Sequence, residues 1–258
     1  MTLSPDLFGF RIIELEETGS TNSYLKQLCI SREVEAFTVV TTESQTAGRG
    51  QRGNFWESEP GKNLTFSLLI RPGFLPAGKQ FLISQIISLS IKEELDCYER
   101  GFSIKWPNDI YWNDCKICGI LIENNLSGSQ ISESILGAGI NLNQKHFKSS
   151  APNPISLTQI TGLEYDRKQF LTNVLRRLKS YYEELRNGHP ENITANYHQS
   201  LYRKNGFHAY EDQEGKFKAE IIRTDPDGML VLRDTESKIR NYAFKEVVFI
   251  PDRQPING

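Results

Sequence analysis

The stretch "KWPNDIYWNDCKICGILIE" (residues 105–123) indicates how the middle of the chain folds. β-Branched and aromatic residues favour extended structure, and Asn113-Asp114 between two such runs is a turn signal. Residues 109–123 are therefore predicted to form a β-hairpin. Downstream, "SILGAGINLN" (134–143) has the apolar character of a buried strand. Together these segments predict a β-sheet in the centre of the protein.

Further strands and helices are predicted before this hairpin. Residues 79–98 carry apolar side chains at helical spacing over a wide face, which predicts a helix that covers the sheet. Another helix is predicted after the first strand, with Ser20 or Thr21 as its N-cap. The strands predicted in this part of the chain are residues 10–17, 36–43, 63–70 and 102–109, the last of them ended by Pro107.

The pattern changes twice in the second half of the chain. A long helix is predicted between Asp166, with Gln169 completing a capping box, and Gly188. Short strand-like runs separated by turn signals then predict a small β-barrel. The expected fold is α+β, with a mixed sheet packed against helices in a large domain (1–205) and a small β-barrel domain (206–258).

The composition is that of an ordinary soluble globular protein. Of 258 residues, 38% are hydrophobic and 24% charged, and 30 basic against 32 acidic residues leave a formal net charge of −2. This balance gives no overall field that attracts nucleic acid or an anionic membrane. The chain has no apolar run near the roughly 18–20 residues that span a bilayer and no signal-peptide pattern at its start, so a cytoplasmic protein is expected.

The hexamer "GRGQRG" (48–53) is a candidate anion-binding loop. Its three glycines let successive N–H groups turn inward, and Arg49 and Arg52 add forked donors that match phosphate or carboxylate oxygens. It has neither the Gly-Lys-Ser/Thr of a P-loop nor Rossmann spacing. A solvated loop or an RNA contact is the alternative interpretation.

Lys116 is a candidate functional lysine because it lies in an apolar strand. From local context, an edge lysine that reaches solvent is the alternative. Period-two alternation predicts Cys118 on the same face as Lys116 and so beside a bound ligand, unless it is core packing or the strand register is shifted by one. Four cysteines (Cys29, Cys97, Cys115 and Cys118) are too few and scattered for a disulfide scaffold, and reduced thiols are expected.

Five fragments occur in an order and spacing that resemble the biotin protein ligases, enzymes that attach biotin to a carrier lysine. The resemblance covers about residues 12–143, with a weaker fit of the C-terminal barrel, and implies a class II synthetase-like catalytic domain followed by an SH3-like barrel. The fragments are "ETGSTNSYL" (17–25), "TTESQTAGRGQRGNFWES" (41–58), "NLTFSLLIRP" (63–72), "KWPNDIYWNDCKICGILIE" (105–123) and "GAGINLN" (137–143).

The resemblance also implies which residues form the site. Biotin is expected to contact Ser20, Thr21, Asn22, Gln45, Arg49, Gly50, Gln51, Lys116 and Gly119. The nucleotide is expected to contact Gly48, Arg52, Trp56 and Asn141. The residues implied to carry the chemistry are Lys116, Arg49, Arg52 and Asp109; Asp109 positions the acceptor lysine or a metal, or else is only a structural turn cap.

The implied reaction forms biotinyl-5′-AMP from biotin and ATP with Mg²⁺, and then transfers biotin to a lysine of the biotin carboxyl carrier protein of a carboxylase. No tightly bound metal, nucleic acid or membrane is expected, and the protein is expected to be a monomer or a homodimer. Gln51 and Asn54 replace residues that are often basic in the family, so weaker retention of the adenylate is expected. The chain starts at the first catalytic strand, so no DNA-binding role is expected.

Two other functions remain as alternatives. The first is a lipoate- or octanoate-attaching enzyme of the same fold, which needs a long aliphatic slot. The second, from a different class, is a nonenzymatic RNA-binding module that uses the basic loop and the barrel.

Overall fold

A computed structural model describes residues 2–148 and 153–251, with the backbone alone for residues 2–7 and Arg52. Its body is a mixed β-sheet in the order β1-β2-β3-β4-β8-β7-β6-β5, in which β2 and β3 are parallel and the other neighbours antiparallel. The strands of this sheet are β1 (Thr2–Leu7), β2 (Phe10–Thr18), β3 (Thr38–Gln45), β4 (Leu64–Ile70), β5 (Phe102–Lys105), β6 (Asp109–Trp112), β7 (Cys115–Ser127) and β8 (Gln130–Ile140).

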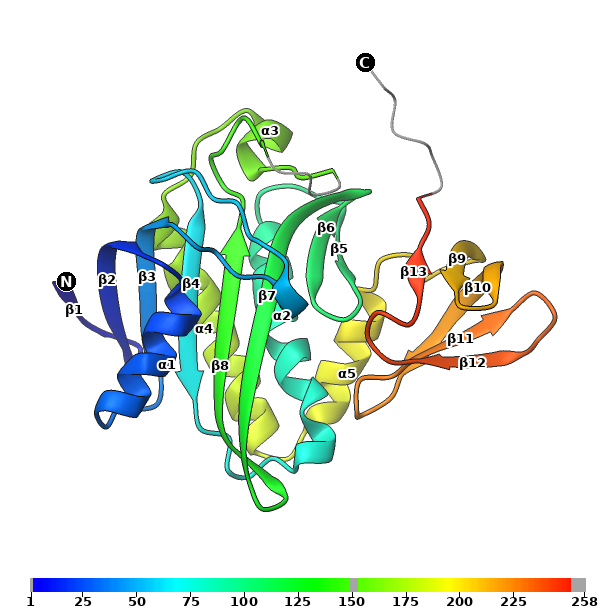
Figure 1. The fold of residues 1–258 in the computed structure, drawn as a ribbon, viewed down its shortest axis with the longest axis horizontal. Coiled ribbons are helices and arrows are strands. Elements are labelled where there is room, and N and C mark those ends of the chain that lie inside the picture. Colours follow the sequence, from blue (N-terminus) through cyan, green and yellow to red (C-terminus); the bar gives the residue numbers. More distant parts are fainter. Residues whose placement is uncertain (1, 149–152, 252–258) are drawn as a thin grey trace.

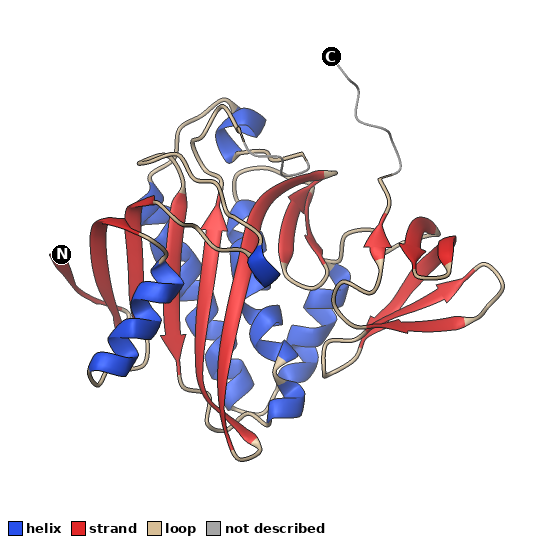
Figure 2. Cartoon of the chain, in the orientation of Figure 1, coloured by secondary structure: helices blue, strands red, loops and turns tan. Residues whose placement is uncertain are grey.

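Helices cover both faces of the sheet. Figures 1 and 2 show α1 in front of the strands and α2, α4 and α5 behind them. The helices are α1 (Thr21–Ser31), α2 (Phe81–Leu95), α3 (Leu157–Thr161), α4 (Arg167–Arg186) and α5 (Pro190–Gln199), with 3₁₀ turns η1 (Gln51–Gly53) and η2 (Ala77–Lys79). Because β4 is covered on both sides, all seven of its residues are buried.

Strand alternation divides the apolar residues into two cores. Leu68 belongs to the large core that includes the apolar face of α2, whereas its neighbour Leu69 packs in a smaller core with Leu25 of α1. Val39 and Val40 of β3 separate in the same way. The sheet is therefore held from both sides, which gives its strands a fixed register.

The C-terminal part is a second sheet of five antiparallel strands in the order β12-β11-β10-β9-β13. The strands are β9 (His208–Asp212), β10 (Gly215–Thr224), β11 (Leu230–Asp234), β12 (Ile239–Tyr242) and β13 (Val248–Phe249). This sheet packs on the body: Trp106 Nε1 donates to the carbonyl oxygen of Gly228 at 2.9 Å. The expected α+β class is confirmed, and the domain boundary at residues 205/206 stays a prediction.

The structure confirms most of the predicted elements and corrects one predicted helix cap. The hairpin predicted over 109–123 is formed by β6 and β7. Ser20 is the N-cap residue of α1 but makes no side-chain capping bond. Asp166 caps α4 by accepting from two backbone N–H groups. The capping box expected with Gln169 is wrong: the Gln169 side chain is hydrogen-bonded to Asn173 and not to the backbone N–H of Asp166. None of the described helices is long and apolar enough to cross a bilayer.

Candidate active site

A cavity of about 870 Å³ opens where the start of α1, the glycine-arginine loop, strands β6 to β8 and the C-terminal segment 244–249 meet. Most of the side chains expected at the site line this cavity, although they are distant in sequence. The expected residues in its lining are Ser20, Thr21, Asn22, Gln45, Arg49, Gly50, Gln51, Trp56, Asp109, Lys116 and Gly119. The fold thus brings together fragments from four of the five sequence motifs; the fragment 63–72 forms the strand behind them.

One end of the cavity is a hydrogen-bonded polar recess at the start of α1. The backbone N–H of Thr21 donates to Oε1 of Gln45 at 2.9 Å, which fixes the Gln45 amide. The buried Ser67 hydroxyl lies 2.8 Å from Thr21 Oγ1 and 2.5 Å from Asn22 Oδ1. A Cβ on Gly137 would lie 2.1 Å from Asn22 Oδ1, so a larger residue there would displace Asn22. The recess therefore offers preorganised donors and acceptors for a small polar group.

The charged centre of the cavity is an ion pair. Lys116 Nζ lies 2.6 Å from Asp109 Oδ2, and the two side chains are 25% and 29% exposed. They come from the adjacent antiparallel strands β7 and β6, so the hairpin holds them together. Partial exposure leaves room for a ligand oxygen to approach the ammonium, which a fully buried pair would not.

A β-bulge in β7 makes the predicted position of Cys118 wrong. Tyr111 pairs with Lys116 whereas Ile110 pairs with Cys118, so Ile117 is an extra residue on β7. Cys118 is fully buried in the large core, and Gly119 lines the cavity with Lys116 instead. Burial raises the pKa of the Cys118 thiol, which makes it a poor nucleophile.

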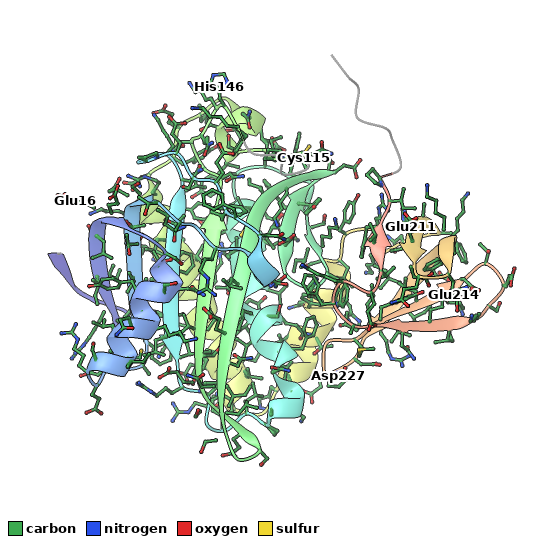
Figure 3. The ribbon with its side chains drawn as sticks, viewed as in Figure 1. Glu16, Cys115, His146, Glu211, Glu214 and Asp227 are labelled. Atoms are coloured by element: carbon green, nitrogen blue, oxygen red, sulfur yellow. The ribbon has the colours of Figure 1, made fainter. Side chains whose placement is uncertain are left out.

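The other cysteine of this pair is unrelated to the cavity. Cys115 lies at the start of β7 (Figure 3) and is half-buried. The structure describes Cys115 and Cys118, like Cys29 and Cys97, as free thiols, as expected. Burial and the negative charge of Asp114 raise the pKa of Cys115.

Trp56 lies on a floor made by two glycines. Gly119 of β7 and Gly139 of β8 are directly paired. A Cβ on Gly119 would lie 2.8 Å from Cζ3 of the Trp56 indole, and a Cβ on Gly139 would lie 2.3 Å from its Nε1. Lys116 Nζ lies 5.8 Å from the centre of the ring. The glycines thus let a large aromatic plane lie flat beside the ammonium, which is the arrangement of a stacking platform.

Arg49 connects the glycine-arginine loop to the recess. Its Nη2 lies 3.5 Å from Glu123 Oε1, and its Nη1 donates to the Ser23 hydroxyl at 3.2 Å. Glu123 also accepts from the side-chain amide of Asn22 at 3.1 Å. The loop is therefore tied to both α1 and β7, but only through exposed or half-exposed groups that can exchange partners.

Three expected site residues lie elsewhere or are not described. Gly48 is outside the cavity lining. The carbonyl oxygen of Trp56 lies so close to it that a Cβ on residue 48 would be 2.3 Å from that oxygen, so only glycine fits there. Asn141 is also outside the lining, and its Nδ2 donates to Ile155 O at 3.1 Å. The side chain of Arg52 lies outside the described residues.

The cavity has further walls that sequence reasoning did not identify. Lys105 and Tyr111 line it from β5 and β6, and Phe244, Val248 and Phe249 line it from the C-terminal segment. The sequence could have pointed to Lys105, since this residue begins the "KWPND" motif. The C-terminal residues had none, because only the packing of the second sheet on the first brings them to the site.

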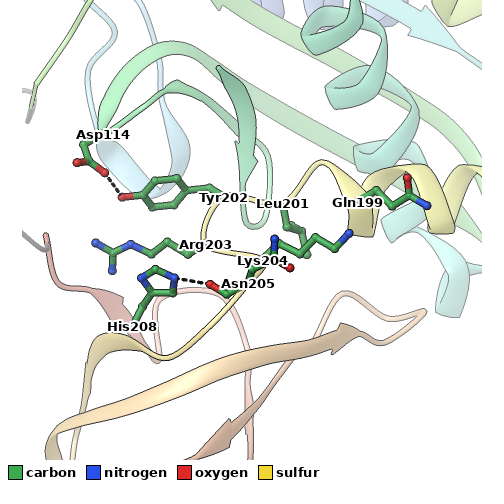
Figure 4. Close-up of a pocket in the computed structure, with 8 residues that line it drawn as sticks. All are labelled: Asp114, Gln199, Leu201, Tyr202, Arg203, Lys204, Asn205 and His208. Carbon is green, nitrogen blue, oxygen red and sulfur yellow. Dashed lines mark hydrogen bonds between the residues drawn. The ribbon is translucent and has the colours of Figure 1, made fainter. Parts of the chain in front are cut away.

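A second cavity, of about 450 Å³, lies between the β6–β7 turn and the start of the C-terminal sheet. Figure 4 shows the Tyr202 hydroxyl donating to Asp114 Oδ1, at 2.5 Å, and His208 beside Asn205, with Nε2 2.9 Å from the Asn205 carbonyl oxygen. None of the expected site residues lines it. We therefore assign the chemistry to the larger cavity.

Metal-binding side chains are sparse in the described parts of the chain. No group of three or more His, Cys, Asp or Glu side chains there could hold a metal ion. Asp109 is the carboxylate in the described lining of the large cavity, and it is paired with Lys116. The described lining therefore offers a metal ion one carboxylate, which is already part of an ion pair.

Comparison with known proteins identifies the family. The model of the biotin/lipoate A/B protein ligase family matches residues 15–141. A biotin--[acetyl-CoA-carboxylase] ligase from Paracoccus denitrificans is 32% identical over 166 residues, which are 61% of this chain and 67% of that protein. The chain belongs to the biotin/lipoate A/B protein ligase family.

Two other members extend the comparison. The bifunctional ligase/repressor BirA of Escherichia coli is 33% identical over 179 residues, which are 69% of this chain but 55% of that protein, so this chain spans about half of it. The biotin protein ligase from Aquifex aeolicus, solved in complex with biotin and ATP, is 27% identical with a TM-score of 0.77, covering 92% of this chain and 97% of that one. The family resemblance in the sequence is confirmed, and so is the expected architecture.

Proposed function

We propose that this family member is a biotin protein ligase, which activates biotin with ATP and transfers it to a carrier lysine. The observation that carries the proposal is the Lys116–Asp109 pair, which lines one cavity together with the polar recess at Thr21 and the Trp56 platform. The Aquifex aeolicus relative, solved with biotin and ATP, shares this fold. The recess suits the ring of biotin, the ammonium of Lys116 suits its carboxylate, and the Trp56 platform suits the adenine of ATP.

Biotin is assigned to the recess end. The ureido ring of biotin has both N–H donors and a carbonyl acceptor, which suit the hydroxyl of Thr21 and the amides of Asn22 and Gln45. Its carboxylate is then directed toward Lys116, with Arg49, Gly50 and Gln51 along its chain. Ala138 of β8, beside Gly137 in the cavity lining, is assigned an apolar contact with the ring.

ATP is assigned to the platform end. The indole of Trp56 offers a face on which adenine can stack, beside the ammonium of Lys116. The contact expected between the nucleotide and Asn141 is left out of this assignment, because Asn141 is buried outside the cavity lining. Mg²⁺, when bound to the triphosphate, would neutralise part of its charge, with Asp109 the available carboxylate.

In the first step a carboxylate oxygen of biotin attacks the α-phosphorus of ATP. The oxygen–phosphorus bond forms, the bond to pyrophosphate breaks, and pyrophosphate leaves with the electron pair. Both reactants are anions, so the cations Lys116 and Arg49 lower the barrier by stabilising the charge that builds up between them. We assign a similar role to Arg52.

In the second step the neutral amine of the acceptor lysine attacks the acyl carbon. The amide bond forms, the acyl–oxygen bond breaks, and AMP leaves with the electron pair while the amine gives up a proton. Asp109 is assigned to orient this amine or to accept its proton, because Lys116 can exchange its partner for the phosphate. The proposed partner is the carrier domain of a biotin-dependent carboxylase; the oligomeric state, monomer or homodimer, and the cytoplasmic location remain predictions.

Transfer to a carrier tests this proposal. The protein is incubated with ATP, Mg²⁺, an isolated biotin carrier domain, and biotin, lipoate or octanoate in turn, and the mass of the carrier is measured. A biotin protein ligase adds one biotinyl group and nothing from the other two acids. Modification by lipoate or octanoate alone would assign the other branch of the family, and an unmodified carrier in all three reactions would reject ligation.

A further inference from the structure

Lys105 is a second lysine of the large cavity, and the reaction described so far gives it no role. It ends β5 and is paired with Asp109 of β6, while Lys116 of β7 is paired with Tyr111 of β6. β6 lies between β5 and β7, and the two partners on it are two residues apart, so the backbones of the two lysines are roughly 12 Å apart. Both line the same cavity, one on each side of Asp109.

The ammonium of Lys105 is held by aromatic groups rather than by a carboxylate. Its Nζ donates to the Tyr111 hydroxyl at 3.1 Å and lies 4.7 Å from the centre of the Tyr111 ring and 5.4 Å from that of Phe249. Among the described residues it forms no ion pair, because the nearby carboxylate of Asp109 is bound to Lys116 at 2.6 Å. Asp109 therefore compensates the positive charge of Lys105 only in part.

A partly desolvated cation without an ion-pair partner of its own is costly unless an anion binds beside it. Burial lowers the pKa of Lys105; Asp109 opposes this shift, and the positive charges of Lys116 and Arg203 add to it. The aromatic faces stabilise the ammonium only in part. The cavity thus keeps a cation ready at a distance from Lys116 that a polyphosphate chain can span.

We propose that Lys105 binds the β- and γ-phosphates of ATP and stabilises pyrophosphate as it leaves, while Lys116 serves the carboxylate and the α-phosphate. This assignment rests on the proposed function. When the α-phosphorus accepts the biotin oxygen, the electron pair of the breaking bond moves onto the pyrophosphate oxygen. An N–H donor of Lys105 directed at that group stabilises the new charge where it develops. Pyrophosphate is absent from the second step, so Lys105 acts in the first step alone.

The position of Phe249 makes the C-terminal sheet part of this subsite. Its ring packs against Tyr210 at 5.0 Å between centres and lies over the ammonium of Lys105. The second sheet thereby closes the phosphate end of the cavity. Losing the Phe249 ring would loosen the ammonium without removing its charge, so Phe249→Leu should resemble Lys105→Met in direction but with a smaller effect.

The test compares Lys105→Met with Lys105→Arg, and Lys218→Met serves as the control for loss of an exposed lysine of the C-terminal sheet. Three quantities are measured: binding of ATP and of AMP, adenylate formation from biotin and ATP, and transfer from chemically prepared biotinyl-5′-AMP. Circular dichroism checks that each variant is folded.

In Lys105→Met we expect the affinity for ATP to fall about tenfold or more, whereas the affinity for AMP stays unchanged. Adenylate formation should fall on the order of 10²-fold, and the rate of transfer should stay within about twofold of that of the unaltered protein. Lys105→Arg should recover most of the ATP affinity. Equal losses of ATP and AMP binding, or of both half-reactions, would overturn the assignment, as would wild-type ATP affinity. If the unaltered protein forms no adenylate, the proposed function fails, while the ATP and AMP comparison still decides whether Lys105 holds the outer phosphates.

Discussion

Nζ of Lys116 lies 2.6 Å from Oδ2 of Asp109, and the two residues belong to adjacent strands of one hairpin. Neither side chain is fully buried, so the pair can open toward a ligand without leaving a charge in the apolar core. In the proposed reaction a phosphate oxygen competes with Asp109 for the ammonium. The pair therefore links the two half-reactions, since freeing Lys116 for the phosphate also frees the carboxylate for the acceptor amine.

Replacing Lys116 by Met should stop activation more than binding. Biotin keeps the recess at Thr21 and Gln45, but the charge that builds up at the α-phosphorus loses its main stabilising group. We expect adenylate formation in a single turnover to fall on the order of 10²-fold or more. Calorimetry should still detect biotin binding, and a wild-type rate of adenylate formation would remove Lys116 from the mechanism.

Replacing Asp109 by Asn should impair transfer more than activation. An amide there cannot accept the amine proton, so the loss should shrink as pH rises and more of the acceptor lysine is neutral in solution. The measurement is the transfer rate from prepared biotinyl-5′-AMP at several pH values. Equal, pH-independent losses in both steps would mean that Asp109 only caps the turn or holds Lys116.

Replacing Gly139 by Ala should displace the Trp56 indole, because the new Cβ would lie 2.3 Å from Nε1. We expect ATP affinity to fall about tenfold or more, as the loss of a base-stacking surface predicts, with a smaller effect on biotin. Gly78→Ala is the matched control, since no atom lies within 4 Å of its added Cβ. If both variants bind ATP equally well, the indole is not an adenine platform.

Replacing Arg49 by Ala should release the activated intermediate. The loop would lose its ties to Glu123 and Ser23, and with them its hold on a bound phosphate. Free biotinyl-5′-AMP in the filtrate of a reaction without carrier should increase, and bystander lysines should become biotinylated. The same amount of free adenylate as in the unaltered protein would show that Arg49 does not retain it.

The buried position of Cys118 predicts a different result of thiol labelling from the position beside a ligand that strand alternation predicts. Cys118 is fully buried with a raised pKa, whereas Cys97 is exposed. Timed alkylation followed by mass spectrometry should therefore modify Cys97 first and Cys118 last, with no effect of biotin and ATP on Cys118. Protection of Cys118 by ligands would contradict the bulge at Ile117.

The elements that local sequence determines were predictable, and those set by distant packing were not. The hairpin of β6 and β7 and the long helix after Asp166 follow from turn residues, spacing and a cap. Alternation failed at Cys118 because a single extra residue in a strand reverses every later side chain, and nothing in "CKIC" marks the bulge. Phe249 reaches the cavity only through contacts between two sheets, for which the sequence has no local pattern.

Biotin-dependent exchange of labelled pyrophosphate into ATP tests the central claim most directly, because it requires the reversible formation of biotinyl-5′-AMP in the cavity and no carrier. The protein is mixed with ATP, Mg²⁺ and labelled pyrophosphate, with and without biotin, beside the Lys116→Met variant. We predict label in ATP only when biotin is present, and a loss on the order of 10²-fold in the variant. No biotin-dependent label in ATP with the unaltered protein would contradict the account.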